Sequence, residues 1–147
     1  SIALMGDIII AGRSAFFLQA FCNIGLVPDG GAAFLLAKSV GRIKAMELML
    51  LGERYPAEQA LQDGLITRMV DDDEVIETAM KYADKLAKGP SKALAMIRKS
   101  AWAALDSSFN DQLKLERKLQ KTAGLTQDFK EGVAAFREKR KPNFTGQ

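Results

Sequence analysis

The chain has 147 residues, of which 48% are apolar and 27% charged, enough apolar sequence for one domain with a core. The net charge of +3 is too small for a strongly basic nucleic-acid binder, and the absence of histidine excludes Ser-His and Cys-His nucleophile pairs. The single cysteine excludes an internal disulfide, and no run of 18 apolar residues predicts a membrane span.

The first third of the sequence is β-like. The β-branched run Ile8-Ile9-Ile10 lies between turn signals and predicts a buried strand. A second short apolar run spans 15–18, and an irregular apolar stretch spans 21–27 and ends at Pro28. Because the chain opens in strand-like sequence without an initiator methionine, we expect it to be a fragment of a longer protein.

The rest of the sequence is mainly helical. Helices are predicted over 32–39, 42–51, 56–63 and 75–87, after Ser91, after Ser107 or Ser108, and from about Gln127, with a β pattern at 65–70. Gly52 is expected to stop the second helix, and 71–73 to cap the fourth. The apolar stripes of the later helices are expected to pack into a core. A composition shift predicts two units, a mixed α/β part over 1–70 and an all-helical region over 71–147.

One acidic residue lies in a setting suited to acid/base chemistry. Asp29 follows Pro28 and precedes Gly30 and Gly31, whose lack of a side chain lets backbone approach a ligand closely. Apolar surroundings, such as the residues before this turn, raise the pKa of a carboxylate and make it a usable proton shuttle. The alternative is that the carboxylate caps the following helix, and the spacing alone favours this second interpretation.

The remaining polar features have simpler interpretations. The basic cluster at 137–141 either contacts a phosphate or is solvated, with solvation favoured. Cys22 is expected to be a small buried apolar residue rather than a reactive thiol. The other isolated acids, Glu47, Glu58, Glu116 and Glu131, are expected on polar, solvated faces.

Nine short motifs are spread along nearly the whole chain. They are LMGDIIIA at 4–11, IGLVPDGG at 24–31, VGR at 40–42, AMEL at 45–48, AEQA at 57–60, GLI at 64–66, EGV at 131–133, AF at 135–136 and KRKP at 139–142. Together they resemble the crotonase (enoyl-CoA hydratase/isomerase) superfamily. The IGLVPD pattern is most similar to that of the phenylacetate-pathway enoyl-CoA isomerases.

This resemblance implies a fold, an assembly and a substrate class. The fold is α/β: the C-terminal part of a crotonase-like spiral of ββα turns, followed by an all-helical region used for trimerisation. The assembly would be a homotrimer or a hexamer built as a dimer of trimers. The family binds acyl-CoA thioesters and holds their enolates in an oxyanion hole of two backbone N–H groups, both upstream of Ser1. Coenzyme A is part of the substrate, so no separate cofactor is implied.

Two departures from the family pattern favour one reaction. Hydratases use two glutamates, which would fall at Ser1 and about Phe21, and neither position is acidic here. Isomerase-type members place one carboxylate in the Pro-(Asp/Glu)-Gly turn, where this chain has Asp29. The resemblance therefore implies an enoyl-CoA isomerase with Asp29 as its catalytic acid/base. The implied acyl pocket contains Phe21, Ile24, Gly25, Leu26 and Gly30, and the implied CoA contacts are Phe136 and Lys139, for which solvation is the alternative.

Two other functions stay open. One is a hydratase or an acyl-CoA thioester hydrolase of the same family. The other is a non-enzymatic assembly or nucleic-acid-binding module that uses the basic cluster at 137–141, which the shortness of that cluster argues against. We expect a cytoplasmic location, no metal, and neither nucleic acid nor membrane as a partner.

Overall fold

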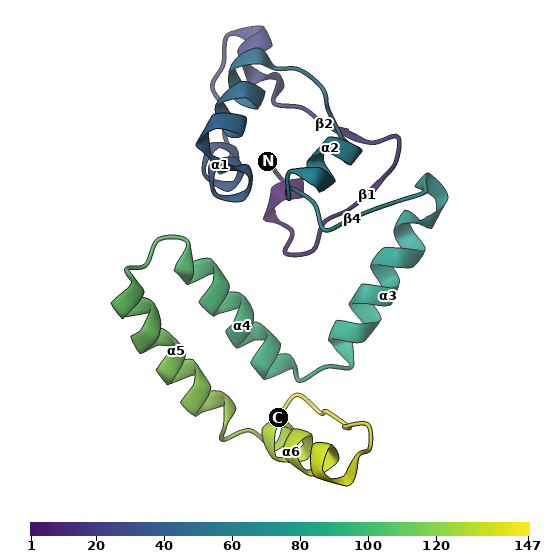
Figure 1. The fold of residues 1–147 in the computed structure, drawn as a ribbon, viewed down its shortest axis with the longest axis vertical. Coiled ribbons are helices and arrows are strands. Elements are labelled where there is room, and N and C mark those ends of the chain that lie inside the picture. Colours follow the sequence, from purple (N-terminus) through teal and green to yellow (C-terminus); the bar gives the residue numbers. More distant parts are fainter. The chain divides into compact units, whose positions relative to one another are not determined.

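The computed structural model describes residues 1–147, which divide into two compact units, Ser1–Ala79 and Met80–Gln147 (Figure 1). The first unit mixes strands and helices and the second is helical, so the expected α/β class is confirmed. The sequence-based boundary near residue 70 stays a prediction, because the division into units falls nine residues later, inside a helix. No helix combines the length and apolar character needed to cross a membrane.

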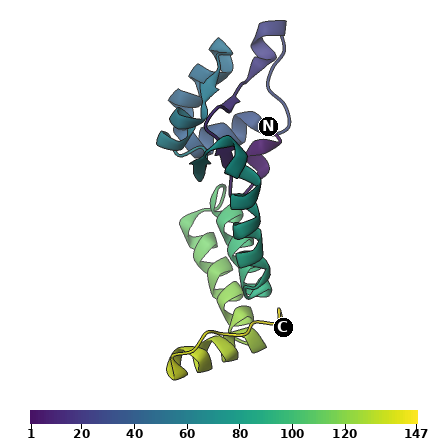
Figure 2. The same cartoon turned by 90° about the vertical axis from the view of Figure 1, so that its right-hand side faces the viewer.

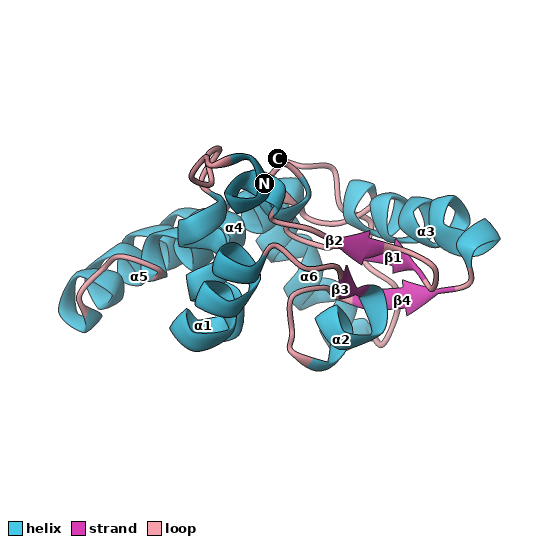
Figure 3. Ribbon diagram, turned by 90° about the horizontal axis from the view of Figure 1, so that it is seen from above, coloured by secondary structure: helices cyan, strands magenta, loops and turns pink.

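Four short strands form two pairs in the first unit (Figure 3). Strand β1 (Ile10–Gly12) runs parallel to β4 (Arg68–Val70), and β2 (Phe16–Phe17) runs antiparallel to β3 (Tyr55–Pro56). The predicted strand at 8–10 is wrong in its bounds, because Ile8 is exposed and the pairing begins at Ile10. The small residues that follow are the buried ones.

The close approach of an acidic loop explains why small residues are buried in β1. A side chain at Gly12 would place its Cβ 2.4 Å from Asp72 Oδ1. That carboxylate accepts the backbone N–H of Ser14 at 3.0 Å, and its neighbour Asp71 pairs with Arg13 at 3.2 Å. The hydrogen bonds from Ser14 lower the pKa of Asp72. The prediction that 71–73 caps a helix is therefore wrong at Asp71, which makes no side-chain cap at the short 3-10 helix η3 (Asp72–Glu74).

One long helix carries most of the core of the first unit. Helix α1 (Ala32–Leu51) is kinked at Gly41, which has φ 79° and ψ 159°, so the two predicted helices are its two halves. Gly52 ends it in the left-handed conformation, as predicted, and α2 (Ala57–Gln62) follows β3. The buried apolar residues of this unit are Leu4, Ala11, Ala32, Leu35, Leu36, Ala45, Leu48, Tyr55, Ala57, Ala60, Leu65 and Ile66.

The second unit is built from four helices, the first of which crosses the unit boundary. They are α3 (Val75–Ala87), α4 (Ser91–Ala104), α5 (Phe109–Ala123) and α6 (Gln127–Glu138). Helices α4 and α5 lie side by side as a hairpin (Figure 2). Of the two serines predicted at the start of α5, Ser108 caps the helix, with its hydroxyl accepting the Asp111 N–H at 3.2 Å, whereas the start predicted at Ser91 has no side-chain cap. Thr126, which the sequence analysis missed, caps α6.

The apolar stripes of these four helices do not form the predicted core. Ile97 is 63% exposed and Phe136 is 85% exposed, and large apolar side chains of α3, α5 and α6 are exposed as well. Only Asp128 and Ala135 are buried in the second unit. A helical hairpin covers only its two facing sides, so the outer apolar faces remain open.

Candidate active site

The turn that carries Asp29 is shaped by glycines in the left-handed conformation. The short 3-10 helix η2 (Ala20–Ile24) ends at Gly25, whose φ is 74°. Gly30 and Gly31 have φ of 57° and 79°, which L-residues rarely adopt, so these two positions require glycine. The Ala32 N–H donates to the Asp29 carbonyl at 3.1 Å as helix α1 begins. The turn therefore fixes Asp29 at the N-terminal end of a long helix.

The Asp29 carboxylate has no structural task within the chain. The residue at the N-cap of α1 is Gly31, and no side chain caps this helix end. The alternative that Asp29 is a helix cap is therefore wrong. Its side chain is exposed and forms no hydrogen bond or ion pair among residues 1–147. A carboxylate held at a fixed point without a structural partner is available for chemistry.

Ser1 lies against this turn, although it is 28 residues away in sequence. Its hydroxyl donates to the Asp29 carbonyl oxygen at 3.0 Å, and a Cβ built on Gly30 would lie 3.1 Å from the Ser1 Cβ. Gly30 thus lets the two segments approach closely. The structure therefore brings Asp29 next to Ser1, which is one of the two positions where the family resemblance predicts a glutamate in hydratases. Ser1 offers a hydroxyl group there instead of a carboxylate.

The residues predicted for the acyl pocket do not enclose a cavity within this chain. Phe21 is half-buried, Ile24 is 75% exposed, and Leu26 is exposed. Gly25 has open space around the position of a side chain. The apolar wall expected next to Asp29 is therefore not formed by residues 1–147. The pocket roles of these residues stay predictions.

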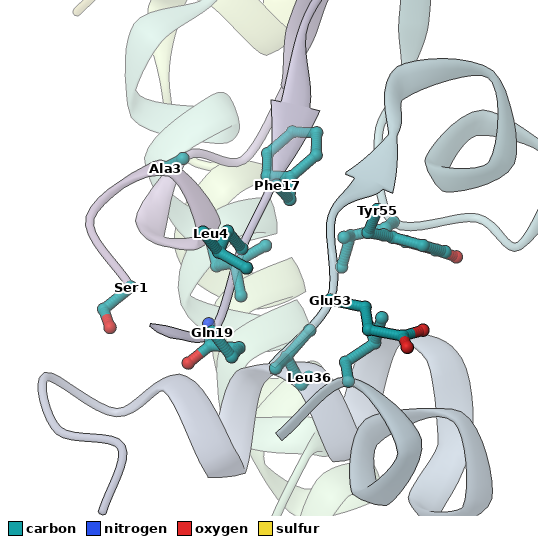
Figure 4. A pocket seen from close by; sticks show the side chains of 11 residues that line it. Ser1, Ala3, Leu4, Phe17, Gln19, Leu36, Glu53 and Tyr55 are labelled. Carbon is teal, nitrogen blue, oxygen red and sulfur yellow. The ribbon is translucent and has the colours of Figure 1, made fainter. Parts of the chain in front are cut away.

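A small cavity of about 50 Å³ lies beside Ser1 (Figure 4). Its lining is mostly apolar and includes Leu4, Phe17 and Leu36. The polar residues of the lining include Ser1, Glu53 and Gln19. Among these, Gln19 is only 8% exposed, and its Oε1 accepts no hydrogen bond. Gln19 was not predicted as a site residue, although it is the one polar residue in the apolar stretch 15–22 apart from Cys22. An unsatisfied buried amide is costly, so it marks a place where a further polar contact would stabilise the site.

The opposite wall of this cavity is held by a polar pair. The Tyr55 hydroxyl donates to Asp63 Oδ2, and Lys44 lies 3.8 Å from the same carboxylate oxygen. Burial, followed by the hydrogen bond to Asp63, raises the pKa of Tyr55. The hydrogen bond from Tyr55 lowers the pKa of Asp63. This pair joins β3 to the end of α2, so it supports the cavity without offering a proton at neutral pH.

The two predicted CoA contacts lie at the C-terminal end of α6, in the second unit. Phe136 is exposed, and Lys139 occupies the C-cap position with φ 55° and ψ 36°. Glu131, predicted to be solvated, instead forms a two-bond ion pair with Arg140 at 2.6 and 2.9 Å. This pair lowers the pKa of Glu131 to about 2 and raises the pKa of Arg140. No group of three or more Cys, Asp or Glu side chains in the chain is arranged to hold a metal ion.

Comparison with known proteins supplies the family context. The sequence profile described as enoyl-CoA hydratase/isomerase matches residues 1–147. The chain is 45% identical over 147 residues to 1,2-epoxyphenylacetyl-CoA isomerase of Escherichia coli K12, covering all of the chain and 56% of that protein. It is 35% identical over 147 residues to trans-2-decenoyl-[acyl-carrier-protein] isomerase of Streptococcus mutans, again covering all of the chain and 56% of that protein.

A solved structure shows the same fold. The crystal structure of enoyl-CoA hydratase from Mycobacterium tuberculosis H37Rv superimposes with a TM-score of 0.94 at 29% identity, covering 99% of this chain and 58% of that one. The expected crotonase-like fold is thereby confirmed. The chain spans about half the length of the curated relatives that it matches.

Proposed function

The chain belongs to the enoyl-CoA hydratase/isomerase family, and from this premise we propose that it is part of an isomerase that shifts a double bond in an acyl-CoA thioester. Asp29 is the acid/base of this reaction. Relatives carry the names of both isomerases and hydratases, so the family alone does not choose between the two reactions.

The observation that carries the proposal is the isolation of one carboxylate. Asp29 is fixed by its turn, has no structural partner, and has Ser1 rather than an acid beside it. Adding water across a double bond needs one group to activate the water and one to protonate carbon, which two carboxylates do well. Moving a double bond adds nothing to the substrate, so one carboxylate suffices as base and then as acid.

The proposed reaction is balanced within the substrate and Asp29. The carboxylate removes a proton from the carbon between the thioester carbonyl and the double bond. The electron pair of that C–H bond forms a new C=C bond to the carbonyl carbon, while the carbonyl π electrons move to the carbonyl oxygen. An oxyanion hole stabilises the resulting dienolate. Asp29 then returns the same proton to a different carbon, which restores the thioester carbonyl and leaves the double bond displaced.

The proposal includes the partners that the site and the surface favour. The substrate is an acyl-CoA thioester, with Phe21, Ile24, Gly25, Leu26 and Gly30 near the acyl group and Phe136 and Lys139 at the CoA. We also propose assembly into a homotrimer or a dimer of trimers. The exposed apolar faces of the helical unit support this assembly, because a second copy would cover them.

The test replaces Asp29 by Asn in the full-length protein, with Asp73→Asn as the matched control on an exposed acid. Conversion of a 3-enoyl-CoA to the conjugated 2-enoyl-CoA is followed by absorbance. We expect kcat to fall by about 10²-fold or more in Asp29→Asn, the usual contribution of a general base, and to stay unchanged in the control. Unchanged turnover in Asp29→Asn would refute the role. Rapid formation of a 3-hydroxyacyl-CoA by the unmodified protein would instead favour a hydratase.

A further inference from the structure

We propose that Glu131, acting through Arg140, is a positioning residue that fixes the backbone of Lys139 so that its ammonium group meets the phosphates of a CoA thioester. This inference rests on the proposed function, from which the CoA contact of Lys139 comes. The new part of the proposal is the set of contacts that holds Lys139 in place. Three features of the second unit support it.

The first feature is the conformation of Lys139. It is the one non-glycine residue of the chain with a positive φ. The left-handed region is unfavourable for a side chain with a Cβ, so surrounding contacts must hold a lysine there. The Lys139 N–H donates to the Phe136 carbonyl at 3.3 Å, and the Arg140 N–H donates to the Ala135 carbonyl at 3.0 Å. Lys139 is therefore the residue at which the chain turns back after α6.

The second feature is the clamp on the residue that follows. The guanidinium of Arg140 donates to Glu131 Oε1 at 2.6 Å and to Oε2 at 2.9 Å, and its Nε donates to Glu138 at 2.6 Å. A bidentate pair of this kind fixes orientation as well as distance. Glu131 also accepts the backbone N–H of Asn143 at 2.7 Å. Because Arg140 directly follows Lys139, fixing Arg140 on α6 limits the backbone angles that Lys139 can adopt.

The third feature is a second anchor one turn earlier on α6. Asp128 is only 4% exposed, and its carboxylate accepts the N–H groups of Thr145 at 2.8 Å and Gly146 at 2.9 Å. The Asp128 N–H donates to the Gln147 carbonyl at 3.1 Å. The segment 140–147 is thus tied to α6 at both ends. Breaking the Glu131 clamp would free the turn at Lys139 while Asp128 still holds the end of the tail.

The charges of this turn are divided unequally. Two glutamates balance Arg140, whereas the Lys139 ammonium has no ion-pair partner in the chain. The hydrogen bonds from Arg140 lower the pKa of Glu131 to about 2, so Glu131 keeps its charge at pH values where an ordinary glutamate would be protonated. The clamp therefore uses the charge of Arg140 for structure and leaves that of Lys139 for an anionic ligand, for which phosphate is a suitable class.

The first experiment compares Glu131→Gln with Glu58→Gln, an exposed glutamate of α2, in the full-length protein. We expect Glu131→Gln to raise KM for a CoA thioester by about tenfold, while kcat stays within about twofold. The same variant should leave KM unchanged for an N-acetylcysteamine thioester, which lacks the nucleotide. The control should change neither constant. An equal rise in KM for both thioesters would overturn the proposal, because it would show a general loss of structure.

A double-mutant cycle then tests whether Glu131 acts through Lys139. If it does, Lys139→Gln alone raises KM for the CoA thioester, and adding Glu131→Gln produces no further rise. Additive effects would overturn the positioning role, and so would an unchanged KM in Lys139→Gln. If Glu131→Gln fails to fold, Arg140→Lys keeps the charge but loses the bidentate geometry, and we expect it to raise the same KM. Direct binding of a saturated acyl-CoA to these variants separates this inference from the double-bond chemistry tested at Asp29.

Discussion

Replacement of Gly41 by alanine tests the kink in helix α1, because a kinked helix and a continuous helix predict opposite changes in the stability of the protein. Gly41 has φ 79° and ψ 159°, in a region that is essentially restricted to glycine, and a Cβ there would meet nothing within 4 Å. Backbone strain is then the sole cost, and we expect about 1–3 kcal/mol of destabilisation. If α1 were continuous at this position, alanine would instead stabilise the helix by about 0.8–1.0 kcal/mol.

Urea unfolding followed by circular dichroism measures this difference. With a slope of about 2 kcal/mol per molar, a loss near 2 kcal/mol lowers the midpoint by roughly 1 M. Gly132→Ala is the matched control: this glycine lies within α6 without a positive φ, and its Cβ would meet Phe144 at an ordinary 3.6 Å. We expect the control to raise the midpoint slightly. A raised midpoint in Gly41→Ala would refute the kink.

Two further predictions concern helix capping and pH. Ser108→Ala should lower stability by about 1 kcal/mol because its hydroxyl accepts the Asp111 N–H, whereas Ser91→Ala, at a helix start without a side-chain cap, should change the urea midpoint little. Equal effects of the two variants would contradict this assignment. Tyr55→Phe should lower the urea midpoint at pH 7, because the Tyr55 hydroxyl stabilises ionised Asp63 and lowers its pKa. A carboxyl group whose pKa is lowered by folding stabilises the folded state at pH values above its pKa in the unfolded chain, and this stabilisation is lost as the pH falls. The difference in urea midpoint between Tyr55→Phe and the unmodified protein should therefore become smaller below about pH 4. A difference that does not change with pH would contradict the role of Tyr55.

Local rules explain why much of the fold could be predicted from the sequence. The stop at Gly52 and the cap at Ser108 follow from single residues and their immediate neighbours. The β-branched run at 8–10 predicted a strand but not its bounds, because the approach of Asp72 to Gly12 is a contact between distant segments. Helical periodicity correctly identified the apolar faces of α4 and α6, but it contains no information on what covers them.

The candidate site was less predictable for the same reason. The Pro-Asp-Gly-Gly spacing favoured a capping role for Asp29, and only the folded turn shows that Gly31 holds the cap position. Glu131 resembled any solvated helix glutamate, because its partner Arg140 lies nine residues away across a turn. The bonds of Asp128 go to backbone N–H groups, which every sequence offers, so no residue pattern could indicate them.

The parallel pairing of β1 with β4 has a consequence for the order of folding during synthesis. Ile10 pairs with Arg68, so the first unit cannot close its sheet until nearly all of its residues have left the ribosome. Contacts over such sequence separations form slowly, because the intervening chain must be ordered first. The hairpin of α4 and α5 joins neighbouring segments and can form as soon as both are made. The β-branched run at 8–10 therefore stays without its β4 partner while the whole segment between the two strands is synthesised, so this run depends on protection from aggregation before folding.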